Sequence, residues 1–99
     1  MSIFNSQPLD GVIPATLLAF DDDMMIDEAA SRRHLRDVAA TDGLSAVTVN
    51  GHASEVHACS FDEQQRILEM SLDEAGDHLP MINGIYSDSS LEAARLARM

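Results

Sequence analysis

The stretch of sequence that decides the fold is residues 46–76, which read AVTVNGHASEVHACSFDEQQRILEMSLDEAG. Its first four residues form a short apolar run that is rich in β-branched side chains, which predicts a buried strand. After a loop, Ser60 and Glu63 have the spacing of a capping box at the start of an amphipathic run, and Gly76 supplies the stop. These residues therefore predict one strand followed by one helix. We expect the apolar face of this helix to consist of Ile67, Leu68, Leu72 and Ala75.

An upstream apolar run, residues 12–20, has the length of a strand and is interrupted only by Pro14. Nearly continuous apolar runs are typical of parallel strands that are buried on both faces, and Pro14 predicts an edge or a bulge where the run begins. Asp27 is placed to cap a following helix, which Gly43 ends. The sequence thus predicts another strand-helix unit, with His34 on the packing face of its helix.

A third apolar run, residues 80–85, precedes a second pair of residues with capping-box spacing, Ser89 and Glu92. The three predicted strands begin at residues 12, 46 and 80, which are 34 residues apart in both steps. This spacing is expected of successive right-handed strand-helix units in a parallel sheet. We therefore predict an α/β fold with three parallel strands, whose two unpaired edges favour self-association.

The composition restricts the classes of function. Seventeen acidic and six basic side chains give a formal net charge of -11, which disfavours binding to nucleic acids and to membrane surfaces. All six basic residues are arginines, so the chain contains no lysine that could form a Schiff base with a carbonyl substrate. The single cysteine, Cys59, has no partner for an intrachain disulfide, and no apolar stretch resembles a signal peptide or a membrane span. We expect a soluble cytoplasmic protein without a cofactor.

Five stretches of sequence carry a resemblance to a known family. They read GVIPATLLAFD (11–21), IDE (26–28), VNGHASE (49–55), FDEQQR (61–66) and PMING (80–84). Their order and spacing resemble the opening of the dihydrodipicolinate synthase/N-acetylneuraminate lyase family, whose loop after the second strand reads G-T-T-G-E or G-S-T-G-E. The resemblance implies that residues 11–99 are the first three strand-helix units of a (β/α)₈ TIM barrel, a fold of about 250 residues. Under this interpretation the domain is truncated, and residues 1–10 are a leader.

The resemblance also implies a reaction. Members of the family are class I aldolases or dehydratases, in which a lysine late in the barrel forms a Schiff base with pyruvate or another 2-oxo acid and a tyrosine relays protons. Both residues follow the region that this chain matches, and Tyr86 precedes the position of that tyrosine. We therefore expect the N-terminal part of a homo-oligomeric lyase that is inactive as this chain. The alternative is a non-catalytic binding or assembly module that completes its sheet by oligomerisation.

The candidate site is the loop after the second predicted strand, which in the family holds the carboxylate of the 2-oxo acid. By position, His52 replaces the family's first hydroxyl residue, which joins the proton relay. Ala53 replaces the second, which contacts the substrate carboxylate, and Ser54 replaces a glycine. We expect His52 to carry protons, and we expect Ala53 and Ser54 to lie against the carboxylate. These departures leave two alternatives open. The family member either synthesises dihydrodipicolinate or is a divergent enzyme that acts on another 2-oxo acid.

Two further interpretations of the residues remain as alternatives. His52, Glu55 and His57 could bind a metal in a hydrolase, although their spacing matches neither the H-E-x-x-H pattern nor its inverse, so we expect no metal site. Cys59 could be a nucleophile, but no sequence pattern of cysteine hydrolases surrounds it.

Overall fold

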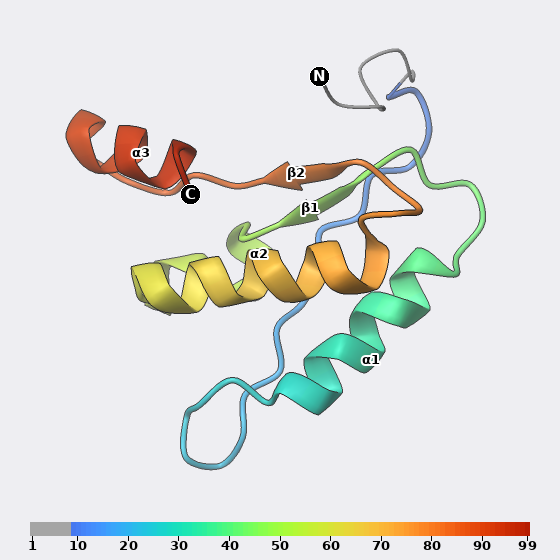
Figure 1. The fold of residues 1–99 in the computed structure, drawn as a ribbon, viewed down its shortest axis with the longest axis horizontal. Helices are drawn as coiled ribbons and strands as arrows, with labels where there is room; N and C mark the ends of the chain where they lie inside the picture. The colour runs from blue at the N-terminus through green and yellow to red at the C-terminus, as the bar shows by residue number, and fades with distance from the viewer. Residues whose placement is uncertain (1–8) are drawn as a thin grey trace.

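The computed structural model describes residues 9–99 (Figure 1). Residues 1–8 of the expected leader lie outside this described part. The elements, in chain order, are α1 (Glu28–Ala39), β1 (Val47–Val49), the 3₁₀ turns η1 (His52–Ser54) and η2 (Val56–Ala58), α2 (Phe61–Ala75), β2 (Met81–Asn83) and α3 (Ser90–Ala97). None of the helices in the described part is long and apolar enough to cross a bilayer.

The sheet has the predicted parallel order. β1 and β2 pair in parallel, with Val47 opposite Met81 and Val49 opposite Asn83. On the other side of β1, the segment 12–20 makes two isolated parallel bridges. The order in space is therefore the segment 12–20, then β1, then β2, which confirms an α/β fold with the first three strand-helix units of a partial TIM barrel.

The segment 12–20, which was predicted to be a strand, forms only isolated bridges and no continuous strand. The two bridges join Val12 to Leu44 and Ala15 to Thr48, so three residue steps in the segment 12–15 lie opposite four steps in the segment 44–48. This mismatch is a bulge at Pro14, which has no N–H to donate and whose carbonyl accepts from the amide of Thr48 at 2.9 Å. The expected irregularity at Pro14 is thus confirmed, and it prevents a continuous ladder.

The helices α1 and α2 pack beside one another, and α2 also contacts both strands (Figure 1). The core between the helices consists of Leu35, Ile67 and Met70. The expectation that Leu72 belongs to the buried face is wrong, because its side chain is half exposed while Met70 is fully buried. Ser71 takes the adjacent buried position, where its hydroxyl donates to the carbonyl of Ile67 at 2.7 Å and so needs no water.

The predicted helix caps are confirmed where the structure shows their hydrogen bonds. Asp27 accepts from the amide of Ala30, and Ser60 and Glu63 make both bonds of the capping box. Ser89 accepts from the amide of Glu92 at the start of α3.

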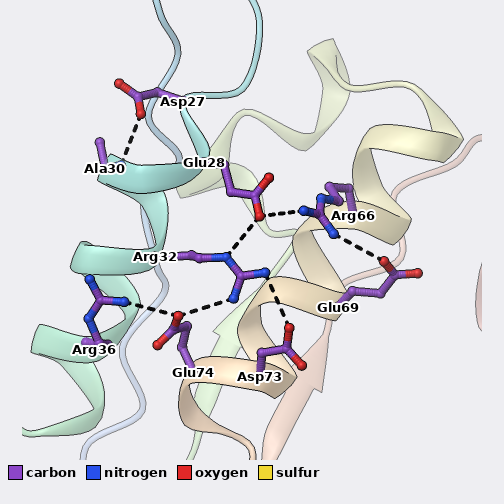
Figure 2. Close-up of polar contacts among 9 residues, drawn as sticks. All are labelled: Asp27, Glu28, Ala30, Arg32, Arg36, Arg66, Glu69, Asp73 and Glu74. Carbon is purple, nitrogen blue, oxygen red and sulfur yellow. Dashed lines mark hydrogen bonds and ion pairs between the residues drawn. The ribbon is translucent and has the colours of Figure 1, made fainter.

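Ion pairs connect the outer surfaces of α1 and α2 (Figure 2). Arg32 of α1 donates to Glu28 at 3.0 Å, to Glu74 at 3.2 Å and to Asp73 at 3.3 Å. Glu28 also accepts from Arg66 of α2. Because each of these arginines joins carboxylates that belong to different helices, the network fixes the two helices relative to each other.

The carboxylate of Glu28 gives this network a pH dependence. The hydrogen bond from Arg66, and then that from Arg32, hold the pKa of Glu28 below its ordinary value of 4.5. A carboxyl group with a lowered folded-state pKa contributes stability above its unfolded pKa, and that contribution is lost as the pH falls through the folded pKa.

We expect the Glu28→Gln variant to melt at a lower temperature than the parent chain at pH 7, and we expect the difference to shrink below pH 4.5. The control is Glu92→Gln, because within residues 9–99 the exposed Glu92 forms an ion pair with Arg95 of its own helix and with no other residue. Thermal melts followed by circular dichroism at several pH values test this. A Glu28→Gln deficit that is equal at pH 7 and pH 3 would contradict the assignment.

Candidate functional site

The candidate site lies at the carboxyl ends of β1 and β2, where two loops are tied together. The amide of Gly84 donates to the carbonyl of Val49 at 2.8 Å. The side-chain amide of Asn50 donates to Oδ1 of Asn83 at 2.8 Å and to the carbonyl of Gln64 at 3.0 Å. Asn50 is almost fully buried, so these bonds fix the end of β1 against β2 and α2.

The close approach of the two chains requires a glycine at position 84. A Cβ atom there would overlap with the carbonyl oxygen of Asn50 and lie 3.0 Å from its carbonyl carbon. Both atoms belong to the backbone and cannot rotate away. Gly84 thus lets the loop after β2 begin directly beside the loop after β1.

The loop after β1 turns sharply because two of its residues adopt left-handed backbone angles. Asn50 has a φ of 53° and Glu55 has a φ of 57°. Left-handed angles in residues other than glycine carry strain and occur most often at sites where the chain must hold a particular shape. Between them, the η1 turn exposes its first two residues.

The three predicted site residues occupy different positions on the η1 turn. The side chains of His52 and Ala53 are exposed, whereas Ser54 is buried and its hydroxyl donates to the carbonyl of Gly51 at 3.0 Å. Within residues 9–99, the amides of His52 and Ala53 donate no hydrogen bond. The structure therefore brings an imidazole and two unpaired amides to one exposed turn and uses the Ser54 hydroxyl to shape that turn.

One aromatic neighbour of His52, Tyr86, was missed in the sequence as a site residue. The ring of Tyr86, three residues after β2, lies edge-to-face with that of His52 at a centroid distance of 5.7 Å. It lies at 6.3 Å from the ring of His57. The available signal was positional, because loops that follow neighbouring parallel strands meet at the same edge of the sheet.

The remaining candidate residues form no site of their own. Burial, and then the charges of Glu63 and Glu55, raise the pKa of the Cys59 thiol, which disfavours the nucleophilic thiolate. In the part of the chain that the structure describes, no group of three or more His, Cys, Asp or Glu side chains could hold a metal ion. Neither the cysteine nor the metal alternative therefore gains support from the geometry.

This chain is similar to members of one protein family both in sequence and in structure. Residues 8–99 match the model of the dihydrodipicolinate synthetase family. The chain is 36% identical over 88 residues to the 4-hydroxy-tetrahydrodipicolinate synthase of Salinibacter ruber. This alignment covers 89% of this chain and 29% of that protein. The chain is 37% identical over 93 residues to an N-acetylneuraminate lyase of Clostridium perfringens, covering 91% of this chain and 31% of that protein.

Solved structures agree with this similarity. A Clostridium difficile protein, CdNal in complex with mannosamine, matches 92% of this chain with a TM-score of 0.78 and 31% identity. The dihydrodipicolinate synthase of Aquifex aeolicus matches 87% of it with a TM-score of 0.77 and 24% identity, which supports the fold alone. This chain covers 31% and 29% of those two chains. It thus spans about three tenths of the length of the relatives that it matches.

Proposed function

Because this chain belongs to the dihydrodipicolinate synthetase family, a family of lyases, we propose that it supplies the first three strand-helix units of a lyase acting on pyruvate or another 2-oxo acid. In this proposal the parent enzyme forms a Schiff base with the substrate carbonyl. The loop after β1 binds the substrate carboxylate.

The observation that carries the proposal is that the backbone amides of His52 and Ala53, next to the His52 imidazole, donate no hydrogen bond to any residue in the described range 9–99. A carboxylate accepts hydrogen bonds from backbone amides at the carboxyl ends of barrel strands. The contact with Tyr86 limits the orientations available to the His52 ring. His52 is thereby placed next to a bound carboxylate, where a ring nitrogen can donate or accept a proton.

The chemistry of the reaction needs a side-chain primary amine, which this chain does not contain. A Schiff base forms when an unprotonated primary amine attacks the substrate carbonyl and water leaves. The side chains of these 99 residues include no lysine, and the arginines stay protonated. We therefore propose that this chain binds the substrate carboxylate weakly and forms no adduct by itself.

A titration with pyruvate tests both parts of the proposal. We expect the amide resonances of His52 and Ala53 to shift in ¹⁵N-edited NMR spectra, while sodium borohydride leaves the mass of the chain unchanged. The Ala53→Thr variant restores a hydroxyl at an exposed position, and we expect it to tighten pyruvate binding at least about tenfold, because a hydrogen bond to a charged group contributes about 1.5 to 3 kcal/mol.

Methyl pyruvate is the control ligand, because it keeps the ketone and lacks the carboxylate. Shifts of equal size with the ester would exclude carboxylate recognition by this loop. A borohydride-trapped adduct on the chain would overturn the proposed inactivity and leave the carboxylate site untouched.

A further inference from the structure

A hollow of about 340 Å³ lies between the loop that precedes α1 and the turns that precede α2. Its volume falls in the range of small-molecule sites, about 300 to 1,000 Å³. The residues that line it are Phe20, Met24, Glu55, Ala58 and Glu63. All of them belong to the first two strand-helix units, so this part of the chain forms the hollow by itself. None belongs to the η1 turn, which makes the hollow separate from the carboxylate site.

One wall of the hollow is a tight loop whose shape is fixed by its own hydrogen bonds. The carboxylate of Asp21 accepts from the amide of Asp23 at 2.9 Å and from that of Met25 at 3.0 Å. The amide of Asp21 also donates to the carbonyl of Met25 at 2.8 Å. These bonds enclose Met24, whose φ of 68° is uncommon for a residue other than glycine. The loop therefore holds two apolar side chains, those of Phe20 and Met24, at the hollow.

The other wall carries two carboxylates. Glu63 is held by the amide of Ser60, which donates to it at 2.9 Å, and Glu55 adopts a left-handed φ of 57°. Within residues 9–99, neither of them forms an ion pair, whereas the other four of the six glutamates pair with arginines: Glu28, Glu69, Glu74 and Glu92. After burial, the charges of Glu63 and then Glu55 raise the pKa of the Cys59 thiol, so both charges act on the same place.

This lining suits an organic cation better than a metal ion. Ca²⁺ takes about six to eight oxygen ligands, and Mg²⁺ requires an octahedral set of them. Two carboxylates among three apolar side chains do not supply such a set. By contrast, the face of the Phe20 ring attracts a cation, and the thioether of Met24 packs well against hydrocarbon. The hollow thus combines negative charge for an ammonium group with apolar surface for the group attached to it.

We propose that this hollow binds a small primary ammonium ion that carries an apolar group. Glu55 and Glu63 pair with the ammonium, and the apolar group packs against Phe20 and Met24. The site does not rest on the proposed reaction with 2-oxo acids, because it uses neither the imidazole of His52 nor the amides of the η1 turn.

A titration of the 99-residue chain with benzylammonium chloride, followed by NMR at physiological ionic strength, tests the site. We expect saturable shifts of the methyl signals of Met24 and Ala58. In Glu55→Gln the dissociation constant should rise roughly two- to fivefold, the size of one exposed ion pair. Glu63→Gln should weaken binding as much, since glutamine keeps the acceptor oxygen of the capping box. The matched control is Glu69→Gln, which removes a charge from α2 outside the hollow and should leave the dissociation constant unchanged.

Benzyl alcohol is the control ligand, because it keeps the aromatic group and lacks the charge. We expect it to bind roughly tenfold more weakly, since both ion pairs are lost. Equal affinity for the two ligands, or no saturable shift at Met24 and Ala58, would overturn the proposal. An equal loss of affinity in Glu69→Gln and Glu55→Gln would overturn it as well, because it would mean unspecific attraction to a chain with a net charge of -11. Shifts of the same methyl signals on dilution without ligand would assign the hollow to an arginine of a second copy and so exclude the free ligand.

Discussion

Gly84→Ala is expected to lower the free energy of unfolding by about 3 kcal/mol, the upper range for forcing an extra methyl group into a packed site. The new Cβ atom would overlap with the carbonyl oxygen of Asn50. Relief requires that the chain after β2 move away, which also breaks the 2.8 Å bond from the Gly84 amide to Val49. The loss should be visible as a lower midpoint of urea unfolding.

Gly51→Ala is the matched control, because Gly51 lies in the same site. A Cβ atom there would meet only the methyl group of Thr48, at 3.6 Å, which is an ordinary contact. Gly51 also has a φ of -99°, which any residue adopts. We expect this variant to unfold within about 0.5 kcal/mol of the parent chain. If both glycine variants were equally stable, the close approach at Gly84 would not exist in solution.

We expect Met70→Ala to lower the free energy of unfolding by about 3 kcal/mol as well, because it leaves a cavity where Gly84→Ala adds a methyl group. Met70 is the largest fully buried side chain and packs with Leu35 and Ile67 between the helices. Truncation removes its apolar contacts and leaves a cavity that the surrounding helices fill only in part. Urea unfolding at neutral pH measures this loss.

Leu72→Ala provides the comparison on the same helix. Leu72 is 50% exposed, so its truncation loses little buried area and opens no cavity. We expect a change of about 0.5 kcal/mol or less. A larger loss at Leu72 than at Met70 would mean that α2 is rotated relative to this structure.

Local chemistry explains why so much of the fold could be predicted from the sequence. The cap residues Asp27 and Ser60 satisfy amides within their own helix turn, so their role is visible without any knowledge of the rest of the chain. The short apolar runs around β1 and β2 recur at one spacing, and parallel strands connected by helices impose that spacing. These features fix the order and the direction of the elements.

The misses all depend on contacts between distant parts of the chain. Leu72 and Met70 are both apolar, and only the angle at which α2 meets the strands decides which of them is buried. The contact of Tyr86 with His52 depends on the tie between Gly84 and Val49, which joins residues from different loops. The resemblance places the predicted site residues His52 and Ala53 on the loop after β1, where their role stays a prediction, while the buried position of Ser54 required the structure.

The two borders of this sheet differ in a way that bears on the synthesis of the protein. Side chains of α1 already bind Leu17 and Ala19 at the first border, whereas β2 has a neighbouring strand on one side only within residues 9–99. In the proposed eight-stranded barrel the fourth strand would join beside β2, whereas the eighth strand would pair with the outer edge of the segment 12–20. Strands that are translated next can therefore be added beside β2 in the order of translation, whereas closure of the barrel requires the eighth strand to replace the bonds between α1 and residues Leu17 and Ala19.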